Sequence, residues 1–78
     1  MKDLLSAIVC GLVRNPDAVS ITVDEPDSSG VEVYHLHVAP EDMGRVIGKQ
    51  GRIAKEIRSV MRSAANRENK RISVEIDD

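Results

Sequence analysis

The stretch that decides the fold is VIGKQGRI, residues 46–53 of a 78-residue chain. Two glycines, Gly48 and Gly51, bracket a lysine and a glutamine, and apolar residues stand on both sides. Glycine has no Cβ, so another backbone can approach such a loop closely. Three interpretations are open at this point: a loop that grips a nucleotide phosphate, a loop that grips the RNA backbone, and a purely structural turn between two helices.

The nucleotide interpretation requires a strand, then Gly, four residues, and Gly-Lys-Ser/Thr. Here only three residues separate Gly44 from Gly48, and Gln50 stands where the magnesium-binding hydroxyl would be. The segment before the loop has the pattern of a helix. The dinucleotide fingerprint GxGxxG is also absent from the sequence. We therefore disfavour a nucleotide-dependent enzyme.

Hydrophobic periodicity predicts six elements around the loop. Apolar residues at helical spacing predict a first helix over residues 4–13, which Asn15-Pro16 ends. Alternating patterns predict strands at 19–23, 31–38 and 72–76, with a turn-forming loop at 25–30. Helices are expected from Pro40 to the loop and from Gly51 to residues 66–70. The order is helix, strand, strand, helix, helix, strand. It predicts a two-layer α+β domain, a three-stranded sheet covered by three helices.

Two core faces follow from the same patterns. In the second strand, Tyr34, Leu36 and Val38 are expected to face the core, and Val31, Val33, His35 and His37 to lie on the other side. In the last helix, the expected core stripe contains Ile53, Ile57, Val60 and Ala64, with Met61 at its edge. Lys55, Arg58 and Arg62 lie nearly opposite that stripe, so they favour a solvated face over a continuation of an RNA path.

The charge is distributed unevenly. The net charge is −2, yet residues 45–71 carry nine basic and two acidic residues, a net of +7, and the remainder carries −9. A dipolar domain of this kind can bind a polyanion on one side. The chain has one tyrosine and no Phe or Trp, so it cannot stack bases on an aromatic platform. If it binds RNA, backbone charge must dominate the affinity.

Targeting and catalytic signals are weak. The apolar residues 4–13 lack a basic segment before them, and Arg14 ends them too early for a membrane span, so we expect a cytoplasmic protein that does not insert into a membrane. His35 and His37 have no third ligand nearby in sequence, and Cys10 has no base beside it. We expect no metal, no cofactor, no small-molecule substrate and no enzymatic activity.

VIGKQGRI resembles the VIGxxGxxI signature of KH domains, and the element order resembles the bacterial type II form. The resemblance covers residues 1–78 as a single KH domain, with the GXXG loop at 48–51. It implies a parallel strand pair, and a cleft for single-stranded RNA formed by the loop, the two helices it joins and a strand edge. The residues expected to bind RNA are the loop and its apolar and basic neighbours: Gly48, Lys49, Gln50, Gly51, Ile47, Ile53, Arg45, Arg52 and Lys55.

The resemblance also implies a biological role. Small KH proteins of this kind are thought to act as RNA chaperones or post-transcriptional regulators, as homodimers or with a second KH-containing protein, in pathways linked to cell elongation and envelope synthesis. An alternative is a protein-interaction subunit whose RNA contact is secondary. The surface expected for such a contact is the helix edge near Ala54, Met61 and Ala65.

Overall fold

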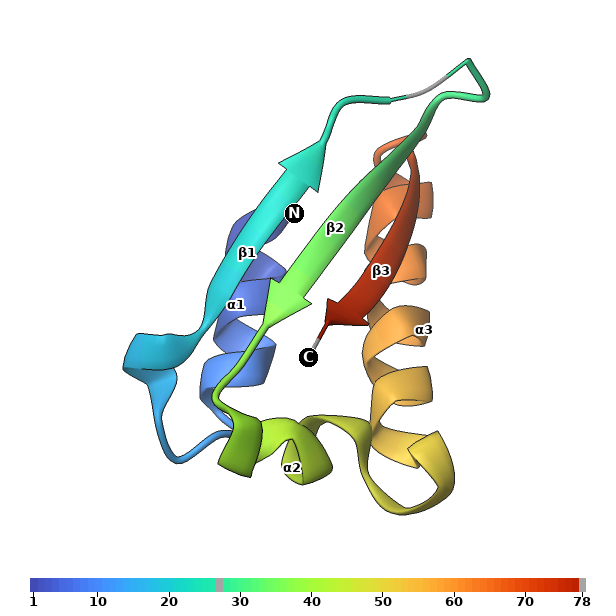
Figure 1. Ribbon diagram of the computed structural model, residues 1–78. Coiled ribbons are helices and arrows are strands. Elements are labelled where there is room, and N and C mark those ends of the chain that lie inside the picture. The colour runs from blue at the N-terminus through green and yellow to red at the C-terminus, as the bar shows by residue number, and fades with distance from the viewer. Residues whose placement is uncertain (27, 78) are drawn as a thin grey trace.

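The computed structural model describes residues 1–26 and 28–77, and in it the chain folds into two layers (Figure 1). The helices and strands follow in the order α1 (Lys2–Cys10), β1 (Ser20–Asp24), β2 (Val31–His37), α2 (Met43–Ile47), α3 (Arg52–Arg67) and β3 (Arg71–Asp77). Short 3₁₀ turns occur at Pro16–Ala18, Pro40–Asp42 and Lys49–Gly51. The predicted α+β class and element order are confirmed.

The sheet has the strand order β1-β2-β3. β1 and β2 pair antiparallel, from Ser20 opposite His37 to Asp24 opposite Val33. β2 and β3 pair parallel, from Val31 opposite Arg71 to His37 opposite Asp77. The parallel pair that the family resemblance implied is therefore present. The expected loop at 25–30 connects β1 to β2, although Asp27 within it lies outside the described residues.

The helices cover one face of the sheet and enclose the core (Figure 1). As expected, Tyr34 and Leu36 of β2 and Val38 directly after it are buried, whereas the residues between them remain partly exposed. Fully buried side chains from every layer meet here, namely Leu5, Val9, Leu36, Val46 and Met61. Within the described part of the chain, no helix is both long and apolar enough to cross a bilayer.

The first helix is shorter than its apolar pattern indicates. α1 ends at Cys10, and Leu12 and Val13 lie in the connection that follows it. Both side chains still pack against the core. Glycine at position 11 weakens the helix at that point. The apolar spacing continues because the connection also contributes to the core.

The predicted core stripe of α3 is partly wrong. The buried residues of α3 are Ala54, Ile57, Met61 and Ala65. Val60 is 47% exposed, and Ile53 and Ala64 are only partly buried. Successive helical residues point about 100° apart, so the buried face is displaced toward the small alanines. Alanine allows α3 to approach the sheet closely, and the larger Val60 is left outside the core.

Candidate nucleic-acid interface

The loop Gly48–Gly51 joins α2 to α3 with a backbone that only some residues tolerate. Gly48 has φ +75° and ψ 176°, and Gly51 has φ +76° and ψ 13°. Gly48 is the residue that ends α2. The observed φ is positive, but the extended ψ puts Gly48 in a region that is essentially restricted to glycine. Between the glycines, Gln50 is left-handed as well, with φ 58°.

Gly48 also has no room for a side chain. A Cβ at this position would overlap Cγ1 of Ile53 and would lie 2.8 Å from its Cβ and 2.9 Å from its backbone nitrogen. A Cβ at Gly51 would meet nothing within 4 Å. Glycine is therefore required at the two positions of the motif for different physical reasons. Gly48 permits the close packing of the loop on the first turn of α3, and Gly51 permits only a left-handed turn.

The amino-terminal end of α3 is electropositive. The first four N–H groups of a helix have no partner within the helix, and the helix dipole adds a partial positive charge there. No side chain caps these groups and no acid lies in the first turn, as far as the described residues show. The first turn instead contains Arg52 and Lys55. The N–H of Arg52 already donates to the carbonyl oxygen of Lys49, so an anionic ligand would bind to the amides that follow it and to these two cations.

Five of the nine predicted site residues line one open hollow of about 580 Å³: Lys49, Gln50, Arg52, Ile53 and Lys55. Its lining combines three cations with one apolar side chain and one amide. Such a surface can hold a phosphate and contact an uncharged group beside it. Ile47 and Arg45 belong to α2 and do not line the hollow. Ile47 is 38% exposed, so its side chain is largely outside the core.

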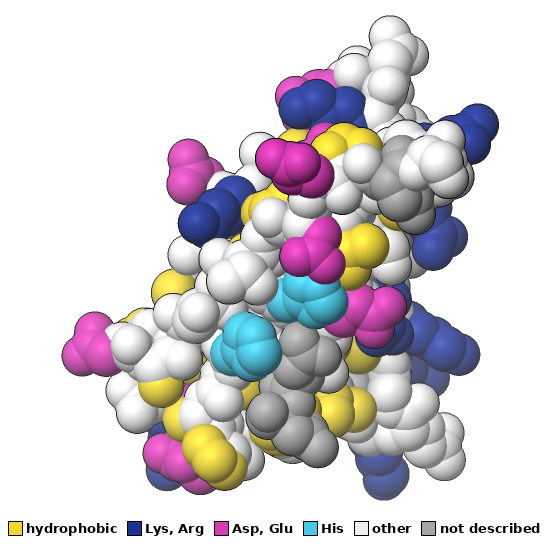
Figure 2. Space-filling view, turned by 45° about the horizontal axis from the view of Figure 1, so that its top comes forward, with side chains coloured by type: hydrophobic (Ala, Val, Ile, Leu, Met, Phe, Trp, Pro, Cys, Tyr) yellow, Lys and Arg dark blue, Asp and Glu magenta, His cyan; other side chains and the backbone are white. Residues whose placement is uncertain are grey.

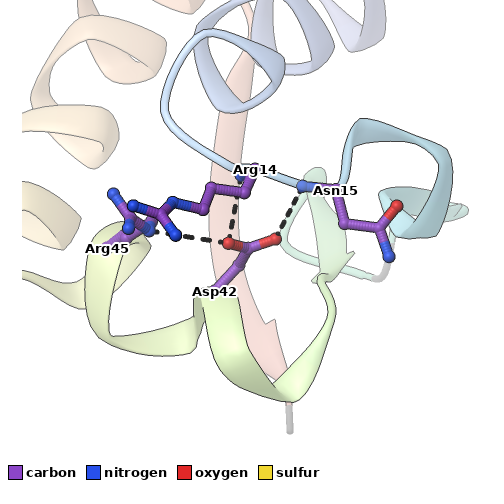
Figure 3. A network of polar contacts seen from close by, with 4 residues as sticks. All are labelled: Arg14, Asn15, Asp42 and Arg45. Carbon is purple, nitrogen blue, oxygen red and sulfur yellow. Dashed lines mark hydrogen bonds and ion pairs between the residues drawn. The ribbon is translucent and has the colours of Figure 1, made fainter.

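Asp42 is a buried acid that the sequence did not single out (Figure 3). It is 0% exposed, and its two carboxylate oxygens accept the backbone N–H groups of Arg14 at 3.1 Å and Asn15 at 3.0 Å. Nε of Arg45 lies 3.7 Å from Oδ1 of the same carboxylate. Asp42 therefore fastens the connection after α1 to the start of α2. The sequence carries no signal for this contact, because the partners lie about 27 residues away and are backbone groups.

A second, smaller hollow of about 200 Å³ lies between α3 and the edge strand β3. Arg58 and Arg62 line it from α3, together with residues 72–75. Nε of Arg58 donates to the carbonyl oxygen of Val74 at 3.1 Å. Arg58 therefore is not simply a solvated cation, as its position opposite the predicted stripe suggested. It bridges the helix to the outer edge of the sheet.

The surface proposed for protein contacts must be corrected. Ala54, Met61 and Ala65 are 5%, 0% and 1% exposed, so they belong to the core and cannot contact a partner. An apolar groove of about 310 Å³ lies instead between α1 and α3. Its apolar lining consists of Leu4, Ile8, Leu12, Ile53, Ile57 and Val60. The groove exists because the core takes the alanine side of α3 and leaves Val60 outside.

Charge is segregated on the surface as the sequence indicated. Lys and Arg side chains gather along the α3 side of the molecule in Figure 2, and the two histidines lie among acidic side chains over the open face of the sheet. Nε2 of His35 lies 2.8 Å from Oδ2 of Asp24. Among the described residues, no group of three or more His, Cys, Asp or Glu is arranged to hold a metal ion. The acidic face of the sheet and the basic face of α3 are thus the two oppositely charged sides of the domain.

Comparison with known proteins gives consistent results. The family model described as KhpA/KhpB, KH domain, matches residues 2–76. The RNA-binding protein KhpA of Clostridium acetobutylicum is 54% identical over 76 residues, which cover 97% of this chain and 99% of that protein. The RNA-binding protein KhpA of Listeria monocytogenes is 49% identical over 76 residues and 97% of each chain.

Two solved structures share the fold at low sequence identity. Era from Aquifex aeolicus has a TM-score of 0.64 and 18% identity over 95% of this chain. Era in complex with MgGDPNP and nucleotides 1506–1542 of 16S ribosomal RNA has a TM-score of 0.66 and 18% identity. This chain spans only 28% of each Era chain. At this level of identity the likeness concerns the backbone arrangement alone.

Proposed function

The chain belongs to the KhpA/KhpB family of KH domains, and we propose that it is a non-enzymatic protein that binds single-stranded RNA through the loop Gly48–Gly51. The observation that carries the proposal is the loop geometry. Gly48 is packed where no Cβ fits, and it is followed by a helix start whose amides have no side-chain cap among the described residues. Relatives over the whole matched length are named RNA-binding proteins.

In this proposal, residues 1–78 act as one KH domain, and the loop holds the RNA backbone rather than the bases. The amides at the start of α3 and the ammonium group of Lys49 contact a phosphate. Arg52, Lys55 and Arg45 add charge around it. Ile47 and Ile53 provide apolar surface for a base, because the chain has no aromatic platform. Gln50 is exposed and can donate to a phosphate oxygen.

The direct test replaces both Lys49 and Gln50 with aspartate. The change lowers the net charge of the loop by three, so RNA binding should be lost while the circular dichroism spectrum stays the same. If about three phosphates are neutralised in the wild type, log affinity should fall with log salt at a slope near −2, by the single-strand factor of ~0.7 per phosphate.

A matched control exists at the other end of α3. Lys70 and Asn69 are also an exposed lysine and an adjacent left-handed residue, with φ 57° at Asn69. Replacing both with aspartate changes the net charge equally, at a site far along α3 from the loop. This control should keep most of the RNA affinity. If the loop variant and the control lose affinity equally, the RNA contact does not involve the loop.

We further propose that the chain acts as a dimer, with a second copy or with a KhpB-like KH protein, as an RNA chaperone or post-transcriptional regulator. The apolar groove between α1 and α3 supports a protein contact, and pairing two weak RNA sites would raise avidity without new RNA contacts. Sedimentation across concentrations, alone and with a KhpB-like partner, tests the contact. Replacing Val60 with aspartate should abolish association, and a strict monomer in both conditions would refute it.

The wider role is proposed on the family relation alone. It comprises a cytoplasmic location and a link to cell elongation and envelope homeostasis. The Lys49/Gln50 aspartate variant tests this link in cells, because it removes the RNA contact and leaves the protein folded. Normal cell length and wall composition in that variant would contradict it. The alternative, a protein-interaction subunit, predicts normal cells with the loop variant and defective cells with the Val60 variant.

A further inference from the structure

The buried carboxylate of Asp42 contacts two arginines from distant parts of the sequence, one through its backbone and one through its side chain. Arg14 contributes its backbone N–H, and its side chain extends from there toward Arg45 in Figure 3. Arg45 contributes Nε, 3.7 Å from the same carboxylate oxygen. Asp42 itself is fully buried. It therefore fixes the backbone of Arg14 beside the side chain of Arg45, and it is not accessible to solvent.

The charges at this place do not balance. Among the described residues, the guanidinium of Arg14 has no acidic partner within ion-pair distance, so its positive charge is not compensated. The carboxylate already accepts two backbone N–H groups, and 3.7 Å is too long for a good hydrogen bond to Arg45. The side chain of Arg45 is 45% exposed. Most donors of the two guanidinium groups therefore remain available, and their planar arrangement suits a phosphate.

The position of the pair relative to the loop is set by α2. Figure 1 shows the connection after α1 and the loop Gly48–Gly51 at opposite ends of α2. α2 has five residues, and at a rise of ~1.5 Å each it is roughly 7 Å long. The N–H of Gly48 still bonds to the carbonyl oxygen of Gly44, at 2.9 Å, so the loop is rigidly joined to α2.

We propose that Arg14 and Arg45 form a second phosphate subsite, which holds the RNA backbone beyond the segment gripped by the GXXG loop. The inference rests on the proposed RNA binding and extends it in a defined direction, across α2 to the connection after α1. Asp42 is the positioning residue of this subsite. It fixes the backbone at Arg14 and restrains the guanidinium of Arg45, without contacting RNA.

Arg14→Ala tests the subsite without disturbing its frame, because Asp42 binds the backbone of Arg14 and not its side chain. The affinity should be measured by fluorescence anisotropy for RNA of about four nucleotides, the span of a GXXG loop, and of about eight. For the longer RNA we expect an affinity about three-fold lower, the size of one exposed ion pair. The slope of log affinity against log salt should become less negative by ~0.7. The shorter RNA should bind unchanged.

Arg67→Ala, which removes an exposed cation in the last turn of α3, is the control and should leave both affinities unchanged. An Arg14 variant with normal affinity and slope for the longer RNA overturns the subsite. An equal loss for both lengths shows a general electrostatic effect and overturns the extended path. NMR resonance shifts of the two arginines on adding RNA give a further check. If inorganic phosphate alone reproduces these shifts in full, the assignment to RNA is overturned. If the wild type binds neither RNA, the proposed function itself is wrong.

Discussion

Gly48→Ala should damage the protein far more than Gly51→Ala, although both change one glycine of the same motif. The structure separates two costs that the motif does not distinguish. At Gly51 the new methyl group would meet nothing within 4 Å, so only the left-handed backbone is disfavoured. At Gly48 the methyl group would overlap the side chain of Ile53 and approach its backbone nitrogen to 2.9 Å.

The magnitudes follow from these contacts. A left-handed alanine costs roughly 1–2 kcal/mol, which is the whole expected loss at Gly51. At Gly48 the backbone region costs roughly 1–3 kcal/mol, and overpacking adds roughly 1–3 kcal/mol. The free energy of unfolding should therefore fall by about 2–6 kcal/mol. A chain of this length has only about 4–12 kcal/mol in total. Gly48→Ala should consequently lose a large share of its stability, and it should unfold at 25 °C only if the wild-type stability lies at the lower end of that range.

Urea denaturation followed by circular dichroism measures both variants. Adding Ile53→Ala to Gly48→Ala provides a further check, because it removes the overlapping Cγ1 but leaves the contacts with Cβ and the backbone nitrogen. The double variant should recover part of the loss that Gly48→Ala causes. Equal destabilisation at Gly48 and Gly51 would refute the steric argument and leave backbone conformation as the only role of both glycines.

Three further predictions concern residues around the loop and in the core. Asp42→Asn should destabilise by about 1–3 kcal/mol, because the buried side chain loses one of the two oxygens that accept the backbone N–H groups of Arg14 and Asn15. The exposed Asp17→Asn is the control in the same urea assay, and equal midpoints would contradict the role of Asp42. Gln50→Gly should stabilise the protein by roughly 0.5 kcal/mol. Glycine adopts the left-handed backbone of this position without strain, and this gain outweighs the added entropy of the unfolded chain. A lower melting temperature would show that the Gln50 side chain makes a stabilising contact. Burial, and then the nearby charge of Glu32, raise the pKa of Tyr34. The unfolded chain therefore loses this proton first, and stability should fall above a pH of about 10; Tyr34→Phe should flatten that part of the pH profile, and an unchanged slope would place the effect on other groups.

The fold was predictable because its signals are local. The strand alternation of β2 placed Tyr34, Leu36 and Val38 in the core correctly. The glycine loop marked where α2 ends and α3 begins, because only some residues tolerate its backbone conformation. The helix expected to begin at Pro40 starts three residues later: Pro40–Asp42 form a 3₁₀ turn, and α2 begins at Met43. The parallel pairing of β2 with β3 was different, since periodicity does not encode which strands become neighbours. Only the family resemblance supplied it.

Predictions that depended on tertiary packing were less accurate. A hydrophobicity pattern predicts deeper burial for Val60 than for Ala54. The face of α3 that packs on the sheet is instead the one that allows the closest approach, and that face carries alanine. The contacts of Asp42 and Arg58 were missed for a related reason. Their partners are backbone groups on other elements. Every residue carries the same backbone groups, so the residue types in the sequence do not indicate such a contact.

The shortness of α2 connects these observations. A helix of five residues has almost no stability of its own, because nucleation is unfavourable and few bonds follow it. Its position must therefore come from contacts at its two ends and from its one buried side chain, Val46. At the start, Asp42 ties it to the connection after α1. At the end, Gly48 packs against Ile53 of α3. The surface proposed to hold RNA runs between these same two anchors, so variants that loosen either anchor should lower RNA affinity even where they remove no cation.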